Sequence, residues 1–149
     1  MTRSPRDPDL GPEALRTFLA HALPDARLTD AVVNVTYEPL LLMHTSHILA
    51  AFAFANGDMR QSYEALYGGF KQYYVERREQ WDALDLAFVF CVQPSAPQLD
   101  EFCSNVETDV YFCRKFVVPM AAPLGTSLAR LPFLPLSPVR GRSLRPGAF

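Results

Sequence analysis

The 149-residue sequence is long enough for one domain with a sizeable hydrophobic core. Its composition, 49% hydrophobic and 20% charged, excludes a disordered chain. The longest apolar runs are far shorter than the roughly 18–20 residues that cross a bilayer, which excludes a membrane-spanning helix. The formal net charge of −2 favours neither nucleic acid nor any other partner.

The charges are distributed unevenly along the chain. Sixteen acidic and eight basic residues precede Val110, whereas six basic residues and no acidic residue follow from there on. Two interpretations remain open: the basic end is attracted to the acidic body, or it meets a phosphate or an acidic partner.

Three cysteines, an odd number on predicted apolar faces, do not indicate a disulfide framework. The polar, proline-rich start of the chain does not resemble a signal peptide. We therefore expect a cytoplasmic protein with reduced thiols.

The first half of the chain predicts a helix and two strands. Residues 1–10 form a polar arm, and residues 11–23 follow with apolar side chains at helical spacing. Residues 31–37 alternate apolar and polar side chains, which predicts an antiparallel edge strand. Residues 47–55 are apolar on both faces, as in a central strand.

A long helix is predicted from Met59 to Trp81. Asp58 can cap this helix, with Gln61 at the third position. Gly68 and Gly69 interrupt the pattern, and each costs about 1 kcal/mol relative to alanine. Close packing against a neighbouring backbone is one explanation, and a hinge is the other.

The second half predicts strands over residues 86–92 and 110–118, with a short helix between them that Ser95 caps. Alternating strands and helices favour parallel pairing. The fold class predicted is α/β: a mixed, mostly parallel sheet of about four strands flanked by helices, with an extended proline-rich C-terminal tail. Residues 1–10 form a flexible arm, 11–118 the single domain and 119–149 the tail.

The tail is apolar and basic without helical or strand periodicity, because prolines recur at 132, 135 and 138. It is too apolar for a free linker, so we expect it to dock on its own domain or on another chain. The residues expected to bind a partner are Leu131, Phe133, Leu134, Leu136, Arg140, Arg142 and Arg145.

No motif for catalysis or cofactor binding stands out. His44 and His47 lack further zinc ligands at a suitable spacing, and no glycine-rich phosphate loop is present. We therefore expect no cofactor and no metal. The alternative is a metal-dependent, nuclease-like hydrolase that uses Asp85, Glu107 and Asp109.

Arg114 and Lys115 are unusual because they lie inside a predicted buried strand, where they point to opposite faces. An internal clamp between Arg114 and a carboxylate, with Glu107, Asp109 and Glu101 nearest in sequence, is one interpretation. A contact with a partner is the other.

These residues also carry a resemblance. The segments WDALDLAFVFCV, LDEFCSNVETDVYFCRKFVVP, LPFLPL and LRPGAF resemble the middle component of ABC-three-component (Lamassu-type) defence systems over roughly residues 47–149. The most specific part is the set Glu107, Asp109, Cys113, Arg114 and Lys115. Members of that family continue beyond the RP element near the end of this sequence.

The resemblance implies a non-catalytic adaptor that links an SMC/Rad50-like ABC ATPase to an effector of the nuclease type in an anti-phage or anti-plasmid complex. It implies contact with DNA through that complex and no contact with a membrane. Direct DNA binding by Arg140, Arg142 and Arg145 is a further possibility.

Overall fold

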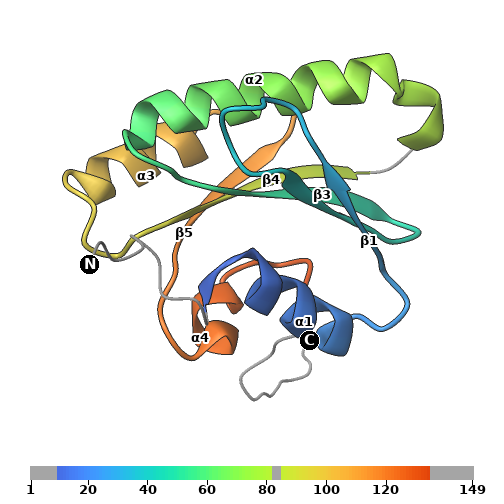
Figure 1. Cartoon of the computed structure of the whole chain (residues 1–149), viewed down its shortest axis with the longest axis horizontal. Coiled ribbons are helices and arrows are strands. Elements are labelled where there is room, and N and C mark those ends of the chain that lie inside the picture. Colours follow the sequence, from blue (N-terminus) through green and yellow to red (C-terminus); the bar gives the residue numbers. More distant parts are fainter. Residues whose placement is uncertain (1–9, 82–84, 135–149) are drawn as a thin grey trace.

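The computed structural model describes residues 10–81 and 85–134. The described residues form a five-stranded sheet in the order β1-β2-β3-β4-β5, with helices on both faces (Figure 1). Strands β1 (Arg27–Ala31), β2 (Leu40–His44) and β3 (Ile48–Phe54) pair antiparallel in succession. Strands β4 (Asp85–Val92) and β5 (Arg114–Pro119) continue the sheet in parallel.

The helices α2 (Met59–Glu76) and α3 (Leu99–Glu107) cover one face of the sheet. Both are crossovers between parallel strands that progress in the same direction, so the right-handed rule places them on the same side. The helices α1 (Pro12–Ala22) and α4 (Leu124–Leu128) lie on the opposite face (Figure 1). The predicted α/β class with a mixed sheet flanked by helices is confirmed.

The two faces have separate cores. Alternate residues of β4 divide between them: Phe88 and Phe90 pack beneath α2 and α3, and Ala87 and Val89 pack against α1. Strand β3 is buried along nearly its whole length, as its apolar sequence predicts for a strand with helices on both faces.

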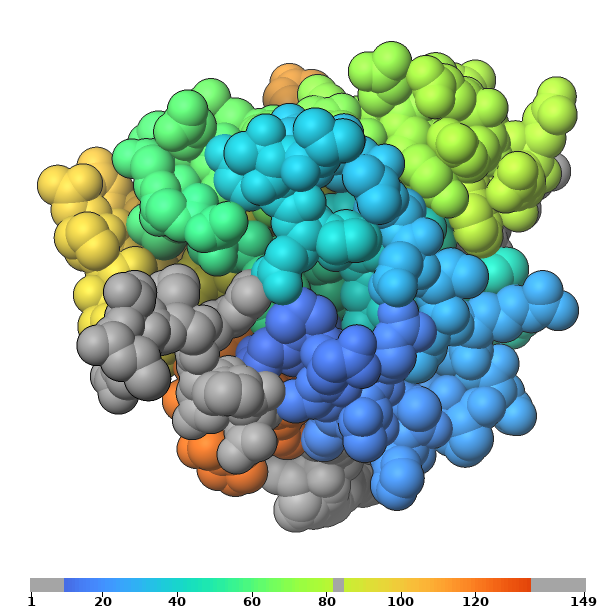
Figure 2. Space-filling view, viewed as in Figure 1, coloured from blue at the N-terminus to red at the C-terminus, as the bar shows by residue number. Residues whose placement is uncertain are grey.

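The prediction of a strand over residues 31–37 is wrong. Strand β1 ends at Ala31, and residues 32–39 form a loop that rises beside α2, as Figures 1 and 2 show in light blue and cyan. Val33 packs against Gly69: a Cβ built on that glycine would lie 2.7 Å from the Val33 side chain. Of the two explanations offered for the glycines, close packing therefore accounts for Gly69, and this packing takes Val33 out of the sheet.

Helix α2 starts where the sequence placed it, because Asp58 accepts a hydrogen bond from the Gln61 amide at 2.7 Å. It ends at Glu76, and a 3-10 helix, η2 (Arg78–Trp81), follows. The prediction for Ser95 is wrong. The residue before α3 is Gln98, at φ 55°, with no side-chain hydrogen bond to the helix.

The packed body continues beyond Val118, where the sequence placed the start of an extended tail. Residues 124–128 form α4, and Leu128, Leu131 and Leu134 are buried in the core that contains α1. The amides of Leu131 and Leu134 each bond to the carbonyl three residues earlier, so the three leucines face the same side. Residues 135–149, with Leu136 and the last three arginines, lie outside the described part.

Candidate functional site

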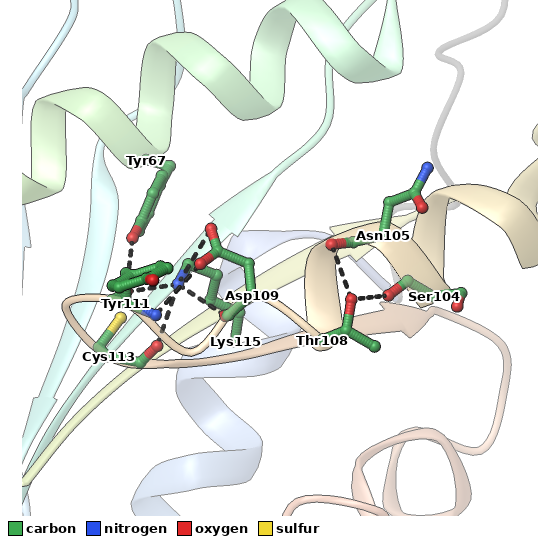
Figure 3. A network of polar contacts seen from close by, with 8 residues as sticks. All are labelled: Tyr67, Ser104, Asn105, Thr108, Asp109, Tyr111, Cys113 and Lys115. Carbon is green, nitrogen blue, oxygen red and sulfur yellow. Dashed lines mark hydrogen bonds and ion pairs between the residues drawn. The ribbon is translucent and has the colours of Figure 1, made fainter.

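Lys115 is the most unusual residue of the structure, because its side chain is completely buried in a strand. Its ammonium group donates hydrogen bonds to the carbonyls of Asp109 (2.9 Å), Tyr111 (2.6 Å) and Cys113 (3.1 Å) (Figure 3). A carboxylate oxygen of Asp109 lies 3.6 Å from the same nitrogen. The buried charge thus gathers the backbone of the preceding segment, residues 108–113, which we call the braced loop.

Helix α2 provides the second support of the braced loop. The Tyr67 hydroxyl donates to the Tyr111 carbonyl at 3.2 Å, and the Tyr67 ring lies 4.9 Å from the Lys115 ammonium (Figure 3). Asp109 also accepts a hydrogen bond from the Tyr111 amide at 3.1 Å. The backbone at Tyr111 is therefore held on three sides.

The contacts of Lys115 and Tyr67 fix the braced loop so that two of its apolar side chains face solvent. Phe112 adopts φ 72°, a conformation that is uncommon for a large residue, and its ring packs against Tyr67, Phe70 and Tyr74. Val110 and Tyr111 are 72% and 83% exposed. The prediction that residues 110–113 belong to the strand is wrong, because the loop must supply carbonyls to Lys115.

Burial shifts the acidity of the groups around the brace. It raises the pKa of Cys113 to about 11, although the positive charge of Lys115 acts in the opposite direction. Burial, followed by the charge that Cys113 acquires once it is deprotonated and by the Asp109 carboxylate, also raises the pKa of Tyr67 above its ordinary value. At neutral pH the thiol and the hydroxyl are therefore protonated, and Tyr67 remains a donor.

An ion pair at the sheet edge replaces the clamp predicted for Arg114. The Glu107 carboxylate accepts two hydrogen bonds from Arg130 at 3.0 Å and one from the Val117 amide at 2.7 Å. Arg130 in turn donates to the Val117 carbonyl at 2.6 Å. The pair thus occupies the outward amide and carbonyl of Val117, as a neighbouring strand would, which protects the edge at that residue.

Arg114 itself is exposed, with its guanidinium 5.2 Å above the Phe116 ring. It borders a pocket of about 640 Å³ at the amino ends of the three parallel strands. Asp85 and His47 line this pocket together with Phe116 and Phe133. It combines aromatic walls with charges of both signs.

The structure does not bring together the three carboxylates of the hydrolase alternative. Glu107 is bound to Arg130 at the sheet edge, and Asp109 faces Lys115 beneath α2. Asp85 lies at the pocket on the opposite face of the sheet. Over residues 10–81 and 85–134 no group of three or more His, Cys, Asp or Glu side chains could hold a metal ion.

Part of the predicted partner-binding tail is used within the chain itself. Leu131 and Leu134 are buried against the body and are not available to a partner. Phe133 is half-buried, and its ring contacts Phe52 and Phe116. Of the two alternatives for the tail, residues 131–134 follow the one that docks on the chain's own domain.

Two residues of the site were not anticipated from the sequence. Tyr67 belongs to the apolar stripe of α2, and nothing in that stripe marks its hydroxyl as a support for the braced loop. Arg130 lies 23 residues from Glu107. The only feature of the sequence that could have indicated Arg130 is the presence of an arginine in an apolar segment.

Comparisons of the chain with protein-family models, with curated proteins and with solved structures find no match. The family and the function therefore stay predictions. In the part of the chain that the structure describes, none of the helices has the length and apolar character needed to span a bilayer.

Proposed function

We propose that the protein is a non-catalytic adaptor subunit that binds its partner proteins through the braced loop. The observation that carries this proposal is the exposure of Val110 and Tyr111 on a backbone fixed by a buried lysine. A loop that is already ordered loses little conformational entropy on binding. Tyrosine is also among the residues that contribute most to protein interfaces.

The resemblance noted in the sequence supports a more specific form of this proposal. Its most specific residues surround the braced loop: Asp109, Cys113 and Lys115 form the brace, Glu107 protects the adjoining edge, and Arg114 is exposed beside it. We propose that the partners are an SMC/Rad50-like ABC ATPase and an effector of a cytoplasmic anti-phage or anti-plasmid complex. The exposed Arg114 favours a partner surface that carries a carboxylate next to an apolar groove.

Co-purification tests the proposal. The chain is expressed with the ATPase and the effector encoded beside it, with the substitutions Val110→Ser and Tyr111→Ser made singly and together. Because both side chains are exposed, the variants should fold, and the double variant should lose at least one partner. The matched control is Val35→Ser, which changes a 93% exposed valine on the other side of α2. Unchanged assembly of the double variant would contradict the proposal.

The role of the tail needs a deletion that leaves the core intact. Removing residues 120–149 would take Leu128, Leu131 and Leu134 out of the packed body, so loss of assembly there would have two explanations. Removing residues 135–149 avoids this problem and tests Leu136, Arg140, Arg142 and Arg145 alone. We expect the shorter deletion to weaken partner binding, and direct contact of these arginines with DNA would make affinity fall steeply with salt.

A further inference from the structure

The large apolar side chains that the described residues expose all lie on α2 or on the two loops that flank it. Val110, Tyr111 and Phe112 lie on the braced loop beside α2, Val32 and Val35 lie on the loop at its other flank, and Val75 lies on α2 itself. Tyr67 and Tyr74 contact the first loop, and Gly69 contacts the second. The outward face of α2 therefore lies between two loops that expose apolar side chains.

The outward face of α2 consists of six exposed residues at helical spacing, which we call the α2 ridge: Gln61, Glu64, Gly68, Lys71, Gln72 and Val75. Gly68 is at its centre. A Cβ at this position would meet nothing within 4 Å, unlike one at Gly69. Packing within the chain therefore does not explain why a glycine, which costs about 1 kcal/mol in a helix, stands here.

We propose that the α2 ridge is the interface of a homodimer, in which α2 of a second copy crosses antiparallel at Gly68. A glycine at the crossing allows two helix backbones to approach closely. The antiparallel arrangement follows from the charges of the ridge.

Helical geometry makes the ridge complementary to itself. Glu64 lies about 6 Å before Gly68 along the axis and Lys71 about 4.5 Å after it, and both lie on the same side of the ridge, rotated from Gly68 by about 40° and 60°. A two-fold axis through the crossing therefore places Glu64 opposite Lys71 of the second copy, and Lys71 opposite its Glu64. The same axis brings Val75 against Gln61.

The charges of the ridge are available for this pairing. Over the described residues neither Glu64 nor Lys71 takes part in an ion pair, and the Lys71 ammonium lies 5.0 Å from the Tyr67 ring. A parallel crossing would place like charges together. A single helix crossing buries less than the roughly 1,200–2,000 Å² of a stable interface, so we expect a weak dimer.

Sedimentation velocity of the full chain, from micromolar to millimolar concentration, tests the proposal. The wild type should shift from monomer to dimer as concentration rises. Gly68→Leu should weaken the dimer by at least about tenfold, because the larger side chain separates the helices. The variant should fold, since the site is open and leucine favours helix. The matched control Glu101→Leu, on the exposed side of α3, should dimerise as the wild type does.

Charge exchange identifies the pairing. Glu64→Lys and Lys71→Glu should each abolish dimerisation, because each places like charges opposite each other. An equimolar mixture of the two variants should associate again, because every charge then meets its opposite. A wild type that stays monomeric at millimolar concentration, a dimer that tolerates Gly68→Leu, or single variants that do not associate on mixing would each overturn the proposal. None of these results bears on partner binding by Val110 and Tyr111.

Discussion

The two loops that flank α2 are held against it by different interactions. The braced loop is fixed by a buried ammonium group that gathers three carbonyls, and its apolar side chains at 110 and 111 point to solvent. The loop of residues 32–39 is fixed by shape, since Val33 packs on Gly69, and Asn34 bonds the Thr36 amide at 2.9 Å. A polar anchor can therefore hold a backbone while leaving apolar side chains free for a partner.

The largest effect is expected when the polar anchor is removed. Lys115→Met keeps the apolar stem but removes one hydrogen-bond donor from each of the carbonyls of residues 109, 111 and 113. We expect a loss of about 2–4 kcal/mol in the free energy of unfolding. Urea denaturation measures it, with the exposed neighbour Arg114→Met as the control, which should change stability by less than about 0.5 kcal/mol. Equal effects of the two substitutions would mean that Lys115 is not an anchor.

The packing of Val33 on Gly69 should be disrupted by the addition of a single methyl group. Gly69→Ala would place a Cβ 2.7 Å from the Val33 side chain and 3.3 Å from its carbonyl oxygen. We expect a loss of about 1–3 kcal/mol. The neighbouring Gly68→Ala adds the same group in open space and should stabilise the monomer by about 0.5–1 kcal/mol. Thermal unfolding at low protein concentration compares them, and a destabilised Gly68→Ala would contradict this account.

A smaller effect is expected from Tyr67, which supports the braced loop from α2. Tyr67→Phe removes the hydrogen bond to the Tyr111 carbonyl and should cost about 0.5–1.5 kcal/mol. It should also raise the hydrogen-exchange rates of the loop amides. Tyr63→Phe is the matched control, because within the described residues the Tyr63 hydroxyl makes no hydrogen bond to the loop. If both variants left exchange in the loop unchanged, the support from α2 would be disproved.

The smallest effect at neutral pH concerns Cys113. Its pKa is about 11 in the folded protein against an ordinary value of 9.0, so the unfolded chain loses this proton first as pH rises. The contribution to stability is therefore complete below about pH 9 and is lost as pH rises towards 11. Comparing the free energy of unfolding of the wild type with that of Cys113→Ala between about pH 9 and pH 11 isolates this contribution. Native Cys113 should also resist alkylation at neutral pH, and rapid alkylation there would show that the thiol is accessible.

The sequence predicted the elements whose apolar pattern is local and complete. The double-sided apolar runs of β3 and β4 and the capped start of α2 are where the pattern placed them. The close packing at Gly69 was one of the two explanations offered for the glycines, although its partner, Val33, was not predicted. The alternation over residues 31–37 gave a wrong prediction of a strand because Val33 packs against a helix instead of a neighbouring strand. The contact that determines this, with Gly69, lies 36 residues away in the sequence.

The site was predicted only in part. Lys115 was identified as anomalous, but the apolar run before it was predicted to be part of the strand. Hydrophobic periodicity does not show that a buried ammonium group requires carbonyl acceptors. An internal clamp was one of two interpretations of Arg114, and the clamp with Glu107 is formed by Arg130 instead. The intervening proline-rich segment gives no periodicity from which the approach of these two residues could be inferred. Leu131 and Leu134 were expected to serve a partner, and the turn after α4 directs them into the core instead.

Hydrogen exchange of the full chain, with and without the ATPase or the effector, tests the central claim most directly. If the braced loop is the partner-binding element, amides of residues 109–113 become protected on complex formation, while those of residues 33–36 exchange as before. Protection confined to α1 and α4, with the braced loop unchanged in both complexes, would contradict the account.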